Sequence, residues 1–329
     1  MAAITLDDWY EAFYTLQRRG SRFFLSKLNP NGLARTRSTF GDEALTVAHW
    51  WIVPAIRQRW NQLITGHPDL RYEDYLMQRY WNGRQGLRLL SLGCGIASHE
   101  RYLARYGQFA EIHCVDLSAP MIRAAEQKAQ AEGLRNTRFE VADIHTLKLP
   151  PQRYDGVLFH ASLHHFAQLD HLIGTRLPQV LKPEGLLIVN EYVGPNRLQW
   201  SEAQLQAANQ ALRELLPAEY RQYFRSRLTK QQISGPGRWR MQLSDPSEAV
   251  ESERILPLLR QHFEPLEEKP YGGNLLVPLL KHIAHHFVPE TDTNQRLLAE
   301  LFRREDQLLQ QEPSLMLFGI YGQQSDTKN

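Results

Sequence analysis

A glycine-rich turn between two apolar segments constrains the fold of this chain more than any other feature of its sequence. The stretch LLSLGCGIAS, from Leu89 to Ser98, runs from an apolar segment into a turn, and Asp116 closes the next apolar segment. Gly93 and Gly95 let the backbone turn sharply and approach a ligand without an intervening side chain. A carboxylate at the tip of the second strand is placed to accept hydrogen bonds from both hydroxyls of a ribose. The pattern predicts a nucleoside-binding pocket.

The glycine pattern leaves an alternative open. Ala97 or Ser98, depending on the alignment, stands where a third glycine completes the GxGxxG motif. An incomplete motif is also compatible with a turn that merely joins a buried strand to a helix. Asp116 at the expected spacing favours the ligand-binding interpretation.

Composition sets the broad class of the protein. The 329 residues are 42% hydrophobic and 22% charged, which is enough for a full core in one large domain or in two. The first thirty residues lack the apolar core of a secretion signal, and no stretch reaches the roughly 20 apolar residues of a membrane helix. We therefore expect a cytoplasmic protein without a membrane span.

Charge and cysteine content narrow the partners and the metal chemistry. The formal net charge of +2 is too small to imply bulk attraction to nucleic acid or to an anionic membrane. The only two cysteines, Cys94 and Cys114, provide neither a disulfide framework nor a cysteine metal site, and we expect both to be reduced.

From Leu87 to about Val193 the sequence alternates between short β-rich runs and longer amphipathic stretches. The runs are LRLLSLG, EIHCVDL, TRFEVAD, YDGVLFHA and GLLIVNEYV. Between them, the stretch APMIRAAEQKAQAEG, which ends at Gly133, and residues 166–181 space their apolar residues as covering helices do. Five strands joined by right-handed crossovers predict a parallel, doubly wound α/β sheet with its ligand crevice at the carboxyl ends of the strands.

Helical segments are expected on both sides of this region. Residues 1–85 carry aromatic residues at helical spacings, which we interpret mainly as packing surface rather than as a ligand cage. After Gly194 we expect helices over 201–216, 252–263, 274–287 and 294–311, a sixth strand over 265–273 and a last strand over 314–322 that pairs back onto the sheet.

In series, these motifs resemble those of the class I S-adenosylmethionine-dependent methyltransferases, over roughly residues 85 to 321. LSLGCG is similar to the first motif of that family, and VDLSAPMI to its ribose-binding second strand. VADI resembles the adenine-contacting loop, and YDGVLFHASLHHF followed by VLKPEGLLIV resembles the fourth and fifth strands. Each motif is common by itself, but the series is specific, and it is similar to a bacterial subgroup with helical additions.

The resemblance implies a fold, a cofactor and a domain organisation. The fold is a Rossmann-like, doubly wound, seven-stranded sheet with the last strand antiparallel and an added helical lid, and the cofactor is S-adenosyl-L-methionine. Three domains are implied: a helical cap over 1–85, a cofactor-binding core over 86–194, and a region over 195–329 that completes the sheet and carries substrate-binding insertions. The implied cofactor-binding residues are Ser91, Gly93, Cys94, Gly95, Asp116, Leu117, Met121, Ala142, Asp143, Ile144 and His160.

The chain also departs from the family pattern. Ser91 occupies a position where many relatives carry an acid that helps to hold the ammonium group of the cofactor, so that contact is expected to pass to backbone carbonyls near Gly93. Ala97 replaces the third glycine, which is easier to accept for a cofactor without a pyrophosphate.

Residues at the ends of the fourth and fifth strands are the candidates for catalysis. His164 and His165 follow the fourth strand, where an imidazole can accept a proton near neutral pH. The alternative is that this pair fixes the loop by hydrogen bonds. Glu191, which ends the fifth strand, is placed either to act as a base or to form a structural ion pair. Tyr192, Arg197, Trp200 and Tyr271 are expected to bind substrate.

Two further clusters allow functional and structural interpretations. His282 and His286, in HIAHHF, have the i, i+4 spacing of metal ligands on a helix, but no HExxH pattern or acidic ligand accompanies them, so we expect no metal. The basic segment 221–240, RQYFRSRLTKQQISGPGRWR, suits either a phosphate-bearing acceptor or a solvated surface.

The leading hypothesis is an enzyme that methylates a small or medium-sized acceptor at oxygen, such as a small molecule or a glycan. Nucleic acid is not the expected partner. An NAD(P)-dependent oxidoreductase is the rival enzyme class, because the same turn and acid serve that cofactor. A catalytically inactive scaffold with the methyltransferase fold is the non-enzymatic alternative.

Overall fold

The computed structural model describes residues 5, 7–10, 49–237 and 247–324 of the chain. The chain alternates between two compact units. The helical unit comprises residues 1–70, 194–248 and 270–316, and the sheet unit comprises 71–193, 249–269 and 317–329. The three-domain division expected from the sequence stays a prediction. Residues 194–237, 247–248 and 270–316, which come after the fifth predicted strand, therefore fall in the same unit as residues 49–70.

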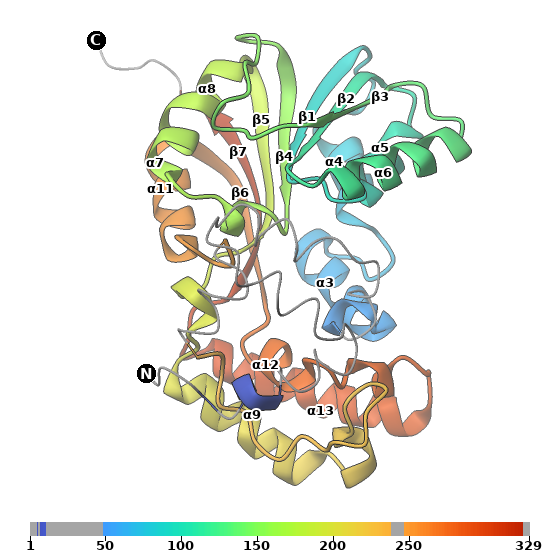
Figure 1. Ribbon diagram of the computed structural model, residues 1–329, viewed down its shortest axis with the longest axis vertical. Helices are drawn as coiled ribbons and strands as arrows, with labels where there is room; N and C mark the ends of the chain where they lie inside the picture. The colour runs from blue at the N-terminus through green and yellow to red at the C-terminus, as the bar shows by residue number, and fades with distance from the viewer. Residues whose placement is uncertain (1–4, 6, 11–48, 238–246, 325–329) are drawn as a thin grey trace. The chain divides into compact units, whose positions relative to one another are not determined.

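A single seven-stranded sheet forms the centre of the sheet unit (Figure 1). Its strand order is β3-β2-β1-β4-β5-β7-β6, and β7 runs antiparallel. The predicted doubly wound α/β fold is therefore confirmed. The strands are β1 (Leu87–Leu92), β2 (Phe109–Asp116), β3 (Thr137–Val141), β4 (Tyr154–His160), β5 (Leu181–Tyr192), β6 (Phe263–Gly272) and β7 (Met316–Gln323).

The register of the central strands brings their carboxyl ends to one edge. Ser91 of β1 lies opposite Cys114 of β2 on one side and Leu158 of β4 on the other, and all three strands run parallel. β4 and β5 pair in parallel as well. Parallel strands with both faces covered need apolar residues on both faces, and β4 and β5 are buried along most of their length.

Helices cover the two faces of this sheet (Figure 1). On one face lie α4 (Tyr72–Arg79), α5 (Ser98–Ala104) and α6 (Ala119–Ala131). On the other lie α7 (Leu169–His171), α8 (Leu177–Val180) and α11 (Ile255–His262). α6 begins with the Ser118 hydroxyl accepting from the backbone N–H of Met121, and Gly133, with φ of 71°, follows its end as predicted.

The single helix expected over 166–181 is interrupted. Between α7 and α8 the chain forms a π-helical stretch over Leu172–Arg176. Pro178, at the start of α8, has no N–H to donate, which favours a wider turn just before it. Gly174, inside this stretch, lies so close to His262 of α11 that an added β-carbon falls 2.9 Å from the imidazole.

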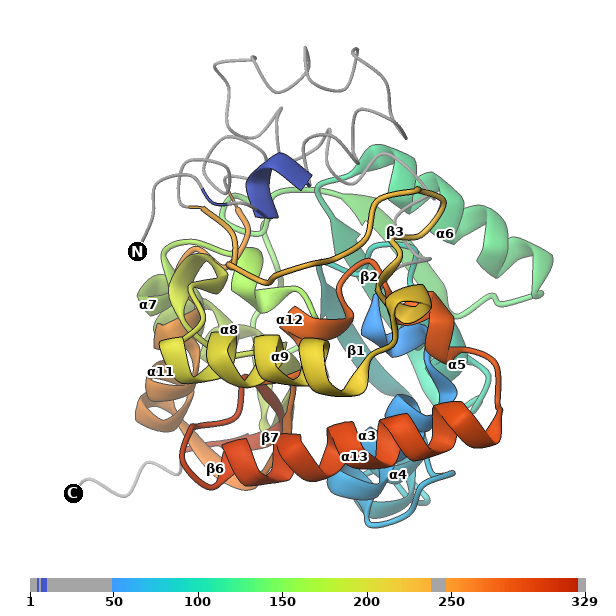
Figure 2. The ribbon, with the colours of Figure 1, turned by 90° about the horizontal axis from the view of Figure 1, so that it is seen from below.

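The helical unit contains α3 (Pro54–Thr65), α9 (Glu202–Leu215), α12 (Leu276–Leu280) and α13 (Asp292–Leu309). α9 packs against both α12 and α13 (Figure 2). α9 begins with a capping box, in which Ser201 and Gln204 each accept a hydrogen bond from the backbone N–H of the other. Among the described N-terminal aromatic residues, Trp50 of this unit and Trp81 of the sheet unit are buried as expected, whereas Trp51 is exposed.

The helix expected over 274–287 is wrong. α12 ends at Leu280, and the ammonium group of Lys230, which is buried, donates to the carbonyls of Pro278, Leu279 and Lys281 at 3.0 Å each. His282 has φ of 67°, and a separate 3-10 turn over Ala284–Phe287 follows. His282 and His286 therefore do not share one helical face.

In the part of the chain that the structure describes, no helix is both long enough and apolar enough to cross a lipid bilayer.

Candidate functional site

The glycine turn after β1 combines a closed side and an open side. Gly93 has φ of 71°, and its N–H donates to the carbonyl of Val115 at 2.8 Å. A β-carbon at Gly93 would lie 2.7 Å from that of Ser162, so only glycine fits between β1 and the loop after β4. At Gly95, with φ of 55°, an added β-carbon meets no other described atom within 4 Å. The turn therefore leaves room next to its backbone at Gly95.

Asp116 is anchored to this turn by the backbone. One carboxylate oxygen accepts the N–H of Gly95 at 2.8 Å, and the other accepts the N–H of Ser118 at 2.7 Å. Burial raises the pKa of Asp116, while these hydrogen bonds and the charge of His165 act in the opposite direction. Its carbonyl accepts the N–H of Ala142, which follows β3. The carboxylate thus has a fixed orientation at the tip of β2.

The other predicted cofactor residues near β2 and β3 have different surroundings. The N–H of Met121 donates to the hydroxyl of Ser118, and the half-buried Leu117 lies between Asp116 and Ser118. A carboxylate oxygen of Asp143 accepts the N–H of His145 at 2.9 Å. The side chain of Ile144 is buried in the apolar core, so only its backbone is available for a ligand.

Ser91 lies beneath the turn in contact with a second acid. Its hydroxyl donates to one carboxylate oxygen of Glu100 at 2.5 Å, and both side chains are buried. Burial raises the pKa of Glu100, while the charge of His99 and the bond from Ser91 oppose that shift. Nearby, a hydrogen bond with the Cys114 thiol and then burial raise the pKa of Cys94 well above its usual value.

At the ends of β4 and β5, one carboxylate holds the loop that follows β4. Glu191 has no exposed surface. One of its oxygens accepts the N–H of Ser162 at 2.5 Å, and the other accepts the N–H of His164 at 3.1 Å. The second oxygen also lies 2.9 Å from Nδ1 of the His164 ring. The hydroxyl of Ser162 donates to the carbonyl of Leu92, which ties this loop to the end of β1.

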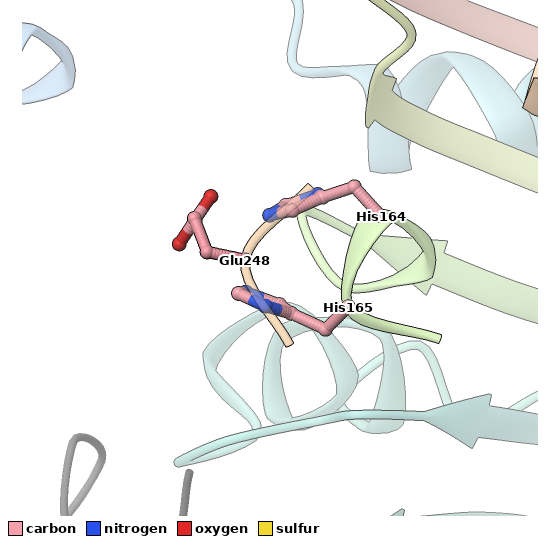
Figure 3. Close-up of side chains that lie close together, drawn as sticks. All are labelled: His164, His165 and Glu248. Atoms are coloured by element: carbon pink, nitrogen blue, oxygen red, sulfur yellow. The ribbon is translucent and has the colours of Figure 1, made fainter. Parts of the chain in front are cut away.

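His164 and His165 project from this loop with their rings close together (Figure 3). Their ring centroids lie 4.1 Å apart at a tilt of 42°. The ring of Tyr192, at the end of β5, lies 6.2 Å from that of His164. The structure thus brings His164, His165, Glu191 and Tyr192 together, as their positions after neighbouring strands predict.

His160, at the end of β4, belongs to a compact aromatic group. Its ring stacks on that of His99 with centroids 3.6 Å apart, and its Nδ1 lies 3.1 Å from the hydroxyl of Tyr72. Burial, followed by the charge of His99, lowers the pKa of His160 well below its usual value. Nδ1 of His99 lies 2.7 Å from a carboxylate oxygen of Glu73, and Glu73 also pairs with Arg71.

The remaining predicted substrate residues belong to the helical unit. Arg197, with φ of 59°, donates to the carbonyl of Glu248 at 3.1 Å. Trp200 is buried, and a β-carbon added at Gly235 would lie 3.6 Å from its ring. Tyr271 packs on Trp60 with ring centroids 5.6 Å apart.

Some side chains of the basic segment 221–240 bind backbone carbonyls within the helical unit. Lys230 binds the carbonyls at the end of α12, and the guanidinium of Arg221 donates to the carbonyls of Leu216 and Arg213. The guanidinium of Arg225 lies over the ring of Phe224 at 5.1 Å. Two other members of the basic segment, Arg238 and Arg240, lie outside the described residues.

Sequence reasoning did not identify three residues that contact the predicted ones. Ser162, Glu100 and Glu73 each contact a predicted residue or its immediate neighbour. Ser162 directly precedes the expected loop LHH, and this position could have identified it as a residue of the site. Glu100 and Glu73 gave none, because their contacts depend on how α5 and α4 pack against each other and on β1.

Comparison with known proteins places this region in a family. The family model described as a methyltransferase domain matches residues 84–259, more than half of the chain. Demethylmenaquinone methyltransferase from Thermus thermophilus is 33% identical over 135 residues, which make up 41% of this chain and 60% of that protein. Malonyl-[acyl-carrier protein] O-methyltransferase from Halorhodospira halophila is 31% identical over 125 residues, or 36% of this chain and 41% of that protein.

Solved structures include a similar chain as well. Phosphoethanolamine N-methyltransferase 2 from Haemonchus contortus, crystallised in complex with S-adenosyl-L-methionine, is 17% identical with a TM-score of 0.48, over 95% of this chain and 60% of that one. The chain covers less than two thirds of the length of each of these three proteins.

The matched residues begin just before β1 and end within α11. They include the glycine turn, Asp116 and the loop after β4, which are the motifs that carry the resemblance found in the sequence. The chain belongs to the methyltransferase-domain family, among the class I S-adenosylmethionine-dependent methyltransferases.

Proposed function

We propose that the sheet unit binds S-adenosylmethionine at the glycine turn and Asp116, and that the protein transfers the methyl group to an oxygen atom of a small or medium-sized acceptor. The observation that carries this proposal is the pair formed by His164 and Glu191 at the ends of β4 and β5, at the same edge of the sheet as the glycine turn. Methyl transfer to a hydroxyl requires a group that removes a proton, and this pair has the chemistry for it.

The described residues fit this cofactor. Open space at Gly95 leaves room for a ligand against the backbone, and the fixed carboxylate of Asp116 has acceptor capacity left for a ribose diol. The loop from Ala142 to Ile144 lies next to Asp116, where the adenine is expected. When bound, the cofactor supplies a methyl group already activated by a sulfonium cation. The protein has mainly to align the acceptor, and positioning can contribute about 7 to 11 kcal/mol in well-oriented systems.

The role of Glu191 in this proposal is positioning rather than proton transfer. Its two oxygens are occupied by two backbone N–H groups and by the ring of His164. A carboxylate at Nδ1 keeps the proton on that nitrogen and leaves Nε2 of His164 as the basic atom. His164 is therefore the proposed proton acceptor, with His165 beside it.

The acceptor is proposed by class. One relative is named for O-methylation of malonyl-[acyl-carrier protein] and another for methylation of demethylmenaquinone, so the names alone include different acceptors. The pairing of a histidine with a buried carboxylate supports a hydroxyl acceptor, of the small-molecule or glycan type. Tyr192, Arg197, Trp200 and Tyr271 are the proposed acceptor-binding residues. The expected cytoplasmic location stays a prediction.

Calorimetric titration with S-adenosylhomocysteine and, separately, with NAD tests the cofactor assignment. We expect binding of the first and none of the second. A panel of acceptors bearing hydroxyl, amine or activated carbon then tests the oxygen assignment by formation of S-adenosylhomocysteine. Failure to bind either S-adenosylhomocysteine or S-adenosylmethionine at millimolar concentration would replace this proposal with the inactive scaffold.

A further inference from the structure

Glu100 is a buried carboxylate with one oxygen that has no partner. The residue is 2% exposed, and its first carboxylate oxygen accepts the hydroxyl of Ser91 at 2.5 Å. Its second oxygen is buried and has no hydrogen-bond partner among the described residues. A buried carboxylate oxygen without a donor destabilises a folded protein, and such atoms are uncommon. A ligand that brings a donor would complete this site.

The charged groups around Glu100 are committed elsewhere. His99, its neighbour in α5, has Nδ1 at 2.7 Å from Glu73, and Arg71 pairs with Glu73 as well. In the described part of the chain, no lysine, arginine or histidine forms an ion pair with Glu100. The charge of His99 favours the ionised form of Glu100, but the His99 ring is bonded to Glu73, so Glu100 has no ion-pair partner among the described residues.

The location of Glu100 is next to the proposed cofactor site. Ser91, its partner, is in β1 two residues before Gly93, and Glu100 itself is in the first turn of α5, directly after the glycine turn. Asp116 is bonded to Gly95 of the same turn from β2. Two carboxylates thus flank one turn, Glu100 from α5 and Asp116 from the end of β2.

We propose that Glu100, oriented by the hydroxyl of Ser91, binds the α-ammonium group of S-adenosylmethionine. The inference rests on the proposed function, since it assumes this cofactor. The ribose diol is assigned to Asp116. Of the two cationic groups of the cofactor, the sulfonium and the α-ammonium, only the ammonium carries N–H donors. The sulfonium has no hydrogen to donate. An ammonium–carboxylate hydrogen bond is charge-assisted, which makes it one of the stronger kinds in a buried site. Glu100 is in this sense a positioning residue for the methyl donor.

A two-by-two binding experiment tests this assignment. Calorimetric affinities are measured for the full-length protein and for Glu100→Gln, each with S-adenosylhomocysteine and with its analogue lacking the α-amino group. In the unmodified protein we expect the analogue to bind about tenfold to a hundredfold more weakly. In Glu100→Gln the two ligands should bind with nearly equal affinity, because the amide no longer attracts the ammonium.

Glu305→Gln is the matched control. Glu305 is a fully buried carboxylate in the helical unit, and its second oxygen likewise has no partner among the described residues. Burial raises its pKa to about 7. We expect Glu305→Gln to leave the preference for the amino-bearing ligand unchanged. If Glu100→Gln does not fold, Glu100→Asp provides the same comparison, because its shorter side chain withdraws the carboxylate.

The outcomes separate this inference from the proposed function. Absence of S-adenosylhomocysteine binding to the unmodified protein would overturn the proposed function and the inference with it. Binding with an undiminished preference for the amino-bearing ligand in Glu100→Gln, or in Glu100→Asp where that variant is used, would overturn the assignment of Glu100 alone.

Discussion

Two regions of the sheet unit use buried carboxylates in opposite ways. In the glycine-turn region, defined here as residues 91–100 with Glu73 and Asp116, Glu100 keeps one oxygen without a partner. In the strand-tip region, defined as Ser162–His165 with Glu191, both oxygens of Glu191 are occupied by the protein itself. Both carboxylates are buried, so their difference lies in the number of donors that the fold supplies.

The difference separates two tasks. A carboxylate whose donors all come from one loop fixes that loop, and Glu191 fixes the backbone from Ser162 to His164 as well as the ring of His164. A buried carboxylate oxygen that lacks a donor lowers the stability of the ligand-free protein, and a ligand that brings a donor removes that cost. The glycine-turn region is thus suited to binding, and the strand-tip region to holding a catalytic side chain.

Asp116→Ala should have the largest effect. It removes two charge-assisted hydrogen bonds to the ribose, of about 1.5 to 3 kcal/mol each, and so weakens S-adenosylhomocysteine binding by about 10² to 10⁴. Calorimetric titration measures the change, and a denaturant melt shows whether loss of the bonds to Gly95 and Ser118 also destabilises the fold. Unchanged affinity in a folded variant would contradict the ribose assignment.

His164→Ala should leave cofactor affinity in place and lower kcat. A positioned base contributes about 10² to 10⁴ in rate, and we expect a loss in that range with a hydroxyl acceptor. His165→Ala is the matched control, since the hydrogen bonds described above for Glu191 go to Ser162 and to the neighbouring His164; its effect should stay below about tenfold. Equal losses in the two variants would argue against a special role for the pair of His164 and Glu191.

Glu73→Gln should remove a pH-dependent part of the stability. Burial alone raises the pKa of Glu73, but hydrogen bonds and charges from His99 and Arg71 outweigh it and lower the pKa to about 2 from 4.5. Because the folded-state pKa is the lower one, the stabilisation is present above about pH 4.5 and is lost as the pH falls towards 2. The shift corresponds to about 3 kcal/mol.

Urea unfolding at neutral and acidic pH measures this contribution. The difference in unfolding free energy between the protein and Glu73→Gln should be greatest near pH 7 and should shrink as the pH falls. Glu300→Gln is the control, because the pKa of Glu300 is also lowered to about 2, by Arg303 and Arg304, but Glu300 is on the surface, where solvent screens the interaction. A pH-independent difference for Glu73→Gln would contradict the linkage.

Ala97→Gly should have the smallest effect. Ala97 has φ of 52° and ψ of 45°, a left-handed conformation that costs a residue other than glycine about 1 to 2 kcal/mol. Replacement by glycine relieves that strain, but it removes a buried methyl group worth about 0.8 kcal/mol and makes the unfolded chain more flexible. The stability measured by thermal or urea unfolding should change by less than about 1 kcal/mol. A destabilisation well beyond that would mean that the methyl group is part of the packing of the turn.

The sheet could be predicted from the sequence because its strands are local patterns. Apolar runs bounded by turn residues predict each strand, and the spacing of the glycine turn and Asp116 predicts that the two lie at one nucleoside pocket. The pairs formed by Ser91 with Glu100 and by His164 with Glu191 depend on the packing of α5 on β1 and on the register of β4 with β5. No spacing rule specifies either.

The helical unit shows where local patterns fail. The apolar periodicity over 274–287 predicts one helix, yet the ammonium of Lys230, far away in sequence, binds the carbonyls at the end of α12. A tertiary contact of this kind ends a helix that its own sequence would continue. Because the unit combines three separate stretches of the chain, the contacts between those stretches have no signature within a window of sequence.

The position of β7 has a consequence for how the protein is made. The backbone passes between the two units five times, and β7, the last strand in sequence, pairs with β5 on one side and β6 on the other. During synthesis β6 therefore cannot pair with the sheet before β7 has been made. The outer edge of β5 likewise stays unpaired until β7 has left the ribosome. An unpaired apolar edge is prone to associate with other chains. This protein is accordingly expected to be most prone to associate with other chains before β7 has been translated.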